Sequence, residues 1–246
     1  MSDHEPTISA LQVEDRVFAP SEGFVAGARI TGPEIYDRAR NDLEGFWSEQ
    51  AAKLEWMTPW TQVLDRSNAP FFKWFTGGTL NVSVNCLDRH LAERGDKVAF
   101  HWEGEPGEVE TLTYRDLHAR VCKLANAMRA QGIGKGDTVA IYMGMIPELP
   151  VAMLACARIG APHTVVFGGF SAEALGDRII DFGCKAVITQ DEGWRNGKIV
   201  PLKKNADDAM VNCPAVTTSI VVQRTGNEVG WVEGRDLWYH DLVADA

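Results

Sequence analysis

The alternation of short apolar runs with amphipathic stretches between residues 138 and 222 constrains the fold more than any other feature. The apolar runs are rich in β-branched residues, which is typical of strands, and the stretches between them have helical periodicity. The predicted strands are 138–143, 163–167, 186–189 and 219–222, and the predicted helices are 148–159, 172–182 and 203–210. Strands separated by helices pair in parallel through crossovers. We therefore predict an α/β fold, a parallel sheet with helices on both faces.

The first third of the chain lacks this alternation. Residues 1–33 are expected to form an extended arm, and Pro33 suits the start of a helix. The apolar residues that follow it at helical spacing are Ile35, Ala39, Leu43, Phe46 and Trp47. Residues 54–79 carry many aromatic rings, which we expect to pack against a domain. We predict two parts: 1–79, an arm with an aromatic-rich segment, and 80–246, the first part of the α/β domain.

A second set of elements is predicted between these two regions. Residues 80–93 have the pattern of a helix, and 98–102 pairs with 109–112 as a hairpin. Thr113 is placed to cap the next helix, with Asp116 completing a capping box. The apolar face of that helix consists of Leu117, Val121, Leu124, Ala125 and Met128.

Composition limits the possible partners. The net charge is −10, which disfavours a nucleic-acid or anionic-membrane partner because both need a basic surface. The five cysteines are widely spaced, which favours free thiols in a reducing compartment over disulfides or metal ligation. The N-terminus has no apolar core of a signal peptide, and Pro150, Arg158 and Pro162 interrupt the longest apolar stretch. We expect a soluble, cytoplasmic protein.

A glycine turn follows the predicted strand 163–167. Gly168 and Gly169 lie between this strand and the next helix, but the third glycine of a dinucleotide fingerprint is missing, and so are the Lys-Ser/Thr of a phosphate loop. Ligands of open α/β sheets bind beyond the carboxyl ends of strands, where this turn lies. Both a plain tight turn and a ligand site remain open.

A basic loop follows the next predicted strand. Residues 193–206 contain four cations and no acid, namely Arg195, Lys198, Lys203 and Lys204. If the strands before this loop and before the glycine turn are neighbours, both lie at one rim of the sheet. Arginine suits forked hydrogen bonds to phosphate oxygens, whereas lysine supplies a mobile point charge. A solvated loop is the alternative to a phosphate site.

The search for catalytic groups is negative. There is no G-x-S-x-G elbow and no H-E-x-x-H pair, and no two carboxylates stand out for acid–base chemistry. The sequence predicts an anion-binding rim, with neither a catalytic residue nor a metal site.

One motif is far more specific. Residues 74–90, WFTGGTLNVSVNCLDRH, resemble the W-F-x-G-G-x-L-N-x-x-x-N-C-x-D-R-H signature of AMP-forming acetyl-CoA synthetases, in the adenylate-forming acyl-CoA synthetase superfamily. Further segments match in order from about residue 32 to the end, among them VVFGGFSAEAL, DEGWRNGK, PLKKNADDAM and WVEGRDLWYHDL. We interpret the CLDRH motif itself as structural.

The resemblance implies an acetate–CoA ligase that makes acetyl-CoA, AMP and pyrophosphate from acetate, ATP and CoA through an acetyl-adenylate. In this family the turn Phe167-Gly168-Gly169 lies against the adenosine of CoA, and Arg195-Asn196-Gly197-Lys198 meets its 3′-phosphate. The ATP phosphate loop, the Mg²⁺ site and the catalytic lysine of the family are absent from these 246 residues.

We therefore expect an N-terminal portion, cut before the phosphate loop, that is inactive alone, exposes one sheet edge and partners the missing C-terminal part. A propionyl-CoA synthetase fragment and a free-standing, non-catalytic nucleotide- or CoA-binding module remain alternatives. A dinucleotide oxidoreductase is disfavoured by the missing glycine. The acyl preference, the oligomeric state and regulation by lysine acetylation are not predicted.

Overall fold

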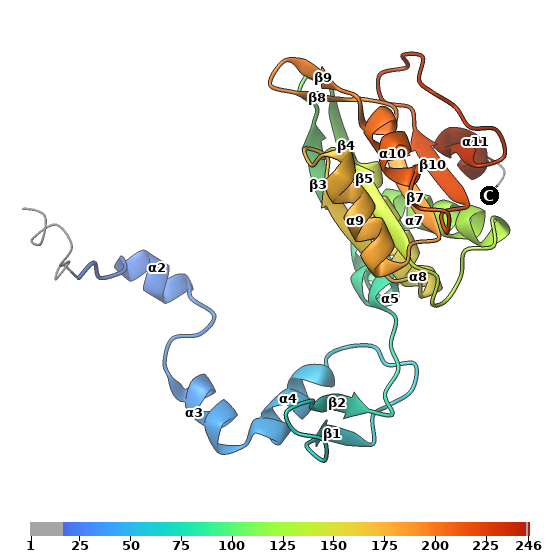
Figure 1. The fold of residues 1–246 in the computed structure, drawn as a ribbon. Coiled ribbons are helices and arrows are strands. Elements are labelled where there is room, and N and C mark those ends of the chain that lie inside the picture. The colour runs from blue at the N-terminus through green and yellow to red at the C-terminus, as the bar shows by residue number, and fades with distance from the viewer. Residues whose placement is uncertain (1–16, 245) are drawn as a thin grey trace, which may run out of the picture. The chain divides into compact units, whose positions relative to one another are not determined.

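The computed structural model describes residues 17–244 and 246, in two compact units (Figure 1). One unit ends at Lys53 and the other runs from Leu54 to Ala246. Residues 1–16 of the predicted arm lie outside the described residues. The predicted boundary between residues 79 and 80 stays a prediction.

The first unit contains short helices, α2 (Glu22–Gly27), α3 (Glu34–Asn41) and α4 (Leu43–Ala51). The helical spacing after Pro33 suggested one helix, but Asp42 separates two. Its backbone leaves the helical region, with φ −141°, and its side chain accepts a 2.9 Å hydrogen bond from the Gly45 amide. Asp42 therefore ends α3 and caps α4, because an aspartate carboxylate satisfies a free amide in the first turn of a helix.

The aromatic-rich segment contains a hairpin that the sequence did not reveal. Strands β1 (Gln62–Asp65) and β2 (Lys73–Thr76) pair antiparallel. Trp56, Trp60 and Phe75 contact one another with ring centroids 4.8–5.6 Å apart. The expectation that the whole cluster packs is wrong for Phe71 and Phe72, which are 74% and 52% exposed.

The predicted parallel sheet is confirmed. Its order is β11-β10-β7-β5-β6, and every pairing is parallel. The strands are β5 (Val139–Met143), β6 (His163–Phe167), β7 (Ala186–Gln190), β10 (Thr218–Val222) and β11 (Asp236–Trp238). Of the strands in this sheet, β11 is the one that had not been predicted.

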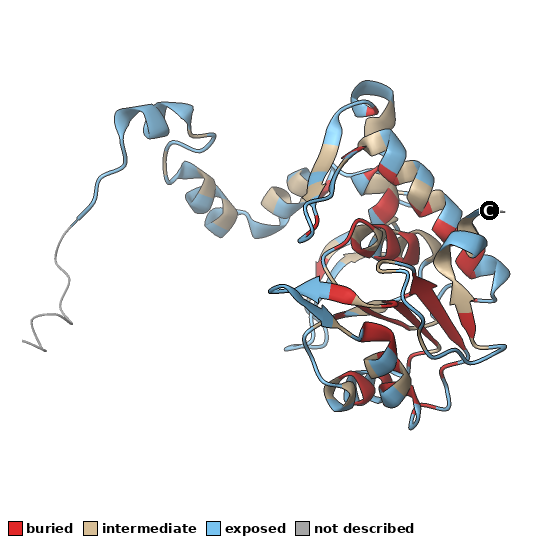
Figure 2. Ribbon diagram, turned by 90° about the horizontal axis from the view of Figure 1, so that it is seen from above, coloured by how far each residue is buried: buried red, intermediate tan, exposed pale blue. Residues whose placement is uncertain are grey.

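Helices cover both faces of this sheet, as predicted. They are α7 (Tyr114–Ala130), α8 (Glu148–Ile159), α9 (Ala172–Phe182), α10 (Leu202–Met210) and α11 (Tyr239–Ala244). On β5, Val139, Ile141 and Met143 belong to the core shared with α7 and α8, whereas Ala140 and Tyr142 belong to the core shared with α9 and α10. This alternation follows from the two-residue period of a strand. Figure 2 shows the buried strands between the two helical layers.

The antiparallel strands β3 (Val98–Glu103) and β4 (Val109–Thr113) and the capping box of α7 are also confirmed. Thr113 Oγ1 accepts from the Asp116 amide, and the Asp116 carboxylate accepts from the Thr113 amide. The predicted apolar face of α7 is buried.

The motif around residue 85 folds differently from the single predicted helix. It forms α5 (Val82–Cys86), a 3₁₀ turn η1 (Asp88–His90) and α6 (Leu91–Arg94). The helix breaks at Leu87, which has φ −121° and ψ −68°. Asn81 Nδ2 donates to the carbonyls of Ala157 and Arg158 at the end of α8, at 3.1 and 3.0 Å. Tertiary contacts therefore override the local helical pattern.

Asp88 and Arg158 form the central ion pair of this motif. Two guanidinium nitrogens of Arg158 lie 2.8 and 2.7 Å from the two carboxylate oxygens, and His118 Nε2 lies 3.2 Å from one of them. The hydrogen bonds from Arg158, with a smaller contribution from His118, lower the pKa of Asp88 to about 2. The pair joins the CLDRH motif to α8, which is a structural role.

The ion pair between Asp88 and Arg158 makes the stability of the fold depend on pH. A lowered carboxylate pKa contributes stability above the unfolded-state pKa, and the contribution is lost as pH falls through the folded-state pKa. We expect Asp88→Asn to cost about 1–2 kcal/mol near neutral pH, discounted for partial exposure, and the cost to shrink as pH falls from about 4 towards about 2. Urea unfolding of both proteins across this range measures it. A pH-independent difference would contradict the assignment.

The cysteines are free thiols. Burial raises the pKa of Cys156 to about 12 and that of Cys184 to about 11, so neither is a reactive thiolate at neutral pH. Among the helices in the described part of the chain, none is long and apolar enough to span a bilayer.

Candidate functional site

The glycine turn joins β6 to α9 at the carboxyl end of the sheet. Ser171 caps α9, with its side chain accepting from the Ala174 amide. From β5 below, Tyr142 Oη donates to the Phe170 carbonyl at 2.8 Å. A Cβ atom on Gly168 would lie 3.2 Å from the Met143 carbonyl oxygen, so the turn has little room for a side chain at that position.

The basic loop forms a two-stranded hairpin. Strands β8 (Gly193–Arg195) and β9 (Lys198–Val200) pair antiparallel around Asn196 and Gly197. Both turn residues have positive φ, 52° and 70°. Two positive φ angles define the hairpin turn that Asn-Gly favours, so this dipeptide was the signal for the missed hairpin.

The hairpin reaches the glycine turn. The Arg195 guanidinium carbon lies 4.9 Å from the centre of the half-exposed Phe167 ring, and a methyl group on Gly169 would collide with Arg195 Nη1. The expected strand adjacency is wrong, because β5 lies between β6 and β7. The two loops meet because the hairpin extends across the end of β5.

A cavity of about 310 Å³ lies between these loops and the β3–β4 pair. Its lining includes Phe167, Gly168, Gly169 and Arg195. On the opposite wall, Trp102 Nε1 donates to the Met145 carbonyl at 2.7 Å. Of the predicted residues, Asn196, Gly197 and Lys198 lie in the hairpin outside the lining.

Arg224 adds a second cation to the lining, one that sequence reasoning missed. Its guanidinium lies 5.2 Å from the Trp102 ring centre and 2.8 Å from a Glu108 oxygen. The hydrogen bond from Arg224 lowers the pKa of Glu108. The charge of Arg224 is thus paired within the protein.

The basic loop is less basic than its sequence suggested. Lys203 is fully buried, and its Nζ lies 2.7 Å from Asp207 and 2.8 Å from Asp236. Burial disfavours the Asp236 carboxylate, but hydrogen bonds from Arg235 and Lys203 outweigh this and lower its pKa. Lys203 therefore supplies no charge to a ligand.

Of the four cations in the basic loop, Arg195 and Lys198 are the two that remain available to a ligand at the rim. Lys204 is exposed on α10 and pairs with Asp208 at 2.5 Å. Arg195 and Lys198 make no ion pair with any residue in the described ranges 17–244 and 246. An anion at this rim would meet these two cations without displacing a carboxylate from them.

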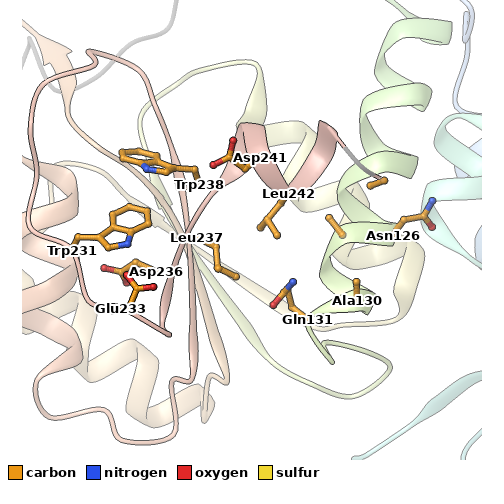
Figure 3. A pocket seen from close by; sticks show the side chains of 12 residues that line it. Asn126, Ala130, Gln131, Trp231, Glu233, Asp236, Leu237, Trp238, Asp241 and Leu242 are labelled. Carbon is orange, nitrogen blue, oxygen red and sulfur yellow. The ribbon is translucent and has the colours of Figure 1, made fainter.

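A larger cavity, about 770 Å³, lies beside β11 and α11 (Figure 3). Trp231 and Trp238 stack there with ring centres 4.6 Å apart. Its charged lining residues are all acidic, namely Glu233, Asp236 and Asp241. A cavity with this charge is a poor phosphate site, so the smaller cavity is the candidate.

Comparisons with known proteins identify the family of the chain. Residues 87–241 match the family described as AMP-binding enzyme, and residues 33–86 match the acetyl-coenzyme A synthetase N-terminus. An acetyl-coenzyme A synthetase 2 of Pseudomonas putida is 55% identical over 86% of this chain and 33% of its own length. The acetyl-coenzyme A synthetase of Rubrobacter xylanophilus is 53% identical over 94% of this chain and 36% of its own length.

A solved structure, the acetoacetyl-CoA synthetase from Streptomyces lividans, is similar with a TM-score of 0.80 and 26% identity, over 92% of this chain and 37% of that protein. The chain thus spans about a third of the length of the relatives it matches. By the match over residues 87–241, the chain belongs to the AMP-binding enzyme family, with the N-terminal segment of acetyl-coenzyme A synthetases in front.

Proposed function

We propose that this chain forms the N-terminal part of an AMP-forming acetate–CoA ligase and contributes part of its CoA site. The complete ligase would convert acetate, ATP and CoA to acetyl-CoA, AMP and pyrophosphate through an acetyl-adenylate. We propose acetate as the acyl substrate because the similar proteins are named acetyl-coenzyme A synthetases, and assays of the complete ligase with acetate and with propionate test this choice. The cellular place we propose is the cytoplasm.

The CoA site proposed here consists of Phe167, Gly168, Gly169 and the hairpin tip Arg195-Asn196-Gly197-Lys198. The single observation that carries it is Arg195, a cation without an ion-pair partner among the described residues, lying over Phe167 beside the glycine turn. A nucleotide with a terminal phosphate needs a face for its ring and a cation for its phosphate. The cavity of about 310 Å³ is within the usual size of ligand sites.

The residues of this chain would bind and orient CoA, and none of them is assigned a bond-making role. Arg195 would hold the 3′-phosphate through forked hydrogen bonds, with Lys198 adding a second charge. ATP and Mg²⁺ would bind to the remaining two-thirds of the ligase. Phe167 and the backbone at Gly168 and Gly169 would contact the adenosine.

The test compares CoA with 3′-dephospho-CoA. In the complete ligase, Arg195→Ala should raise KM for CoA about tenfold, because a hydrogen-bonded charge contact contributes roughly 1.5–3 kcal/mol when formed and less at an exposed site. KM for dephospho-CoA should change much less, and the rate of adenylate formation should not change. Steady-state kinetics and pyrophosphate exchange measure these quantities.

Lys204→Ala is the matched control, because it removes an exposed lysine nine residues further along that already pairs with Asp208. It should leave both KM values unchanged. Equal effects of Arg195→Ala on the two forms of CoA would refute the phosphate assignment.

A further inference from the structure

An acidic residue contacts the proposed phosphate-binding hairpin from a distant part of the chain. Glu105 lies in the loop between β3 and β4, and its two carboxylate oxygens accept the backbone N–H groups of Asn196 and Gly197. The Asn196 bond is 3.0 Å long. The β8–β9 hairpin lies beside the β3–β4 pair in Figure 1. We propose that Glu105 is a positioning residue, which holds this turn so that Arg195 stays over the glycine turn. This proposal rests on the proposed CoA site.

The contact satisfies two donors that the hairpin cannot satisfy itself. In a two-residue turn with positive φ at both positions, the N–H groups of the turn residues point away from the paired strands. Here each N–H meets one oxygen of a single carboxylate. Charge-assisted hydrogen bonds are shorter and stronger than neutral ones, so one exposed side chain can fix the orientation of a short hairpin.

The hairpin is anchored at its base, where Gly193 is buried and Val200 packs against the core shared with α9 and α10, and less so towards its tip. Its strands have three residues each, and a lone two-stranded hairpin is marginally stable in water. Trp194 and Ile199 are both substantially exposed. Glu105 therefore supplies a contact at the tip that carries Arg195 and Lys198, where the hairpin strands themselves are exposed.

The loop that carries Glu105 is itself well defined. The Gly104 amide donates to the Glu108 carbonyl at 2.7 Å, and the Gly107 amide donates to the Gly104 carbonyl at 2.9 Å. Gly107 has φ +97°, a conformation that glycine adopts at low cost. A loop of defined conformation that holds the hairpin tip preorganises Arg195, which lowers the entropy lost on ligand binding.

Glu105 also has an electrostatic cost for an anionic ligand. A carboxylate near the phosphate repels it, so removal of Glu105 could act in two opposite directions. If Glu105 positions the hairpin, its loss weakens phosphate recognition. If it only occupies amides that would otherwise bind phosphate, its loss strengthens phosphate recognition. The sign of the effect therefore decides between the two roles.

The experiment measures two quantities for wild type, Glu105→Ala and Glu105→Gln. The first is amide hydrogen exchange at Asn196 and Gly197 by NMR in the 246-residue chain. The second is the preference for CoA over 3′-dephospho-CoA in the complete ligase. Glu103→Ala is the matched control, since Glu103 lines the same cavity and makes no hydrogen bond to the turn in the described part of the chain.

We expect Glu105→Ala to speed exchange of both amides and to lower the preference for CoA about threefold to tenfold, the effect of freeing one long side chain and its loop. Glu105→Gln should change both quantities less than Glu105→Ala does, because the glutamine side-chain oxygen can still accept a hydrogen bond from one of the two turn amides. In an Arg195→Ala background, Glu105→Ala should change the preference no further, since it acts through Arg195. Glu103→Ala should leave amide exchange unchanged.

Three results would overturn the proposal. The first is unchanged amide exchange in Glu105→Ala, and the second is a higher preference for CoA in that variant. The third is that Glu105→Ala lowers the preference for CoA as much in the Arg195→Ala background as in the wild type. A failure of the CoA assignment is distinguishable, because the wild-type ligase would then not discriminate CoA from dephospho-CoA, while the exchange measurement would still report whether Glu105 holds the turn.

Discussion

Replacing Lys203 with methionine is expected to lower the free energy of unfolding by about 3–5 kcal/mol, the usual cost of removing one partner of a buried ion pair. Lys203 is 0% exposed, and its ammonium group contacts the Asp207 and Asp236 carboxylates and the Gly230 carbonyl. Methionine has a similar length, so the change removes the charge and its hydrogen bonds more than it removes packing. Asp236, also buried, would keep Arg235 as its remaining cation.

Lys204→Met is the matched control for this prediction. Lys204 is the next residue on α10, is exposed, and forms a surface pair with Asp208. Its replacement should change stability by no more than about 0.5 kcal/mol. Urea unfolding followed by tryptophan fluorescence measures both variants, since Trp231 lies 5.9 Å from the Lys203 ammonium. Similar losses in the two variants would show that the Lys203 ion pairs do not stabilise the fold.

Replacing Asp191 with alanine should lower the free energy of unfolding by about 3 kcal/mol, because several backbone donors would lose one buried, charged acceptor at once. Asp191 is 0% exposed and follows β7. Its carboxylate accepts from the amides of Arg224, Thr225 and Gly226 at 2.8–3.0 Å. The residue thus organises the loop after β10 that carries Arg224 into the candidate cavity.

The measurement for Asp191 combines stability with site geometry. Asp191→Ala should lower the urea midpoint and also speed hydrogen exchange of the Thr225 and Gly226 amides. Asp208→Ala is the control, as it removes a carboxylate of a surface pair and should have a small effect on both. A destabilised variant that retains slow exchange at both amides would contradict the assigned role.

The sheet and its covering helices were predictable because several local signals agree there. Helices α8 and α9 and strand β6 have the predicted bounds, since turn residues mark their ends and the period inside each is unbroken. The strands that were missed are short: β8, β9 and β11 have three residues each, and β1 and β2 have four each. A run of three or four residues is too short to show a clear period, so its neighbours in the fold decide whether it forms a strand.

The candidate site was predictable only in part. Arg195 and Phe167 were both expected at the carboxyl end of the sheet, but the reason expected for their proximity, adjacent strands, is wrong, because they meet through the β8–β9 hairpin. Lys203 was wrongly counted among the cations available to a ligand, because the number of charges in a segment does not say which side chains point into the core. Helical spacing would have revealed it, since Lys203, Ala206 and Met210 are all buried on α10. Glu105 is 91 residues from Asn196, and no local pattern joins them.

The Asn196–Gly197 turn has a consequence for the chemical lifetime of the protein. Asparagine followed by glycine is the dipeptide most open to spontaneous loss of the side-chain amide, because the glycine nitrogen attacks the asparagine carbonyl without hindrance. That attack requires the Gly197 nitrogen to lose its proton, and here its N–H donates to Glu105. Deamidation would place a new negative charge between Arg195 and Lys198. We therefore expect the hydrogen bond from the Gly197 N–H to Glu105 to slow deamidation of Asn196.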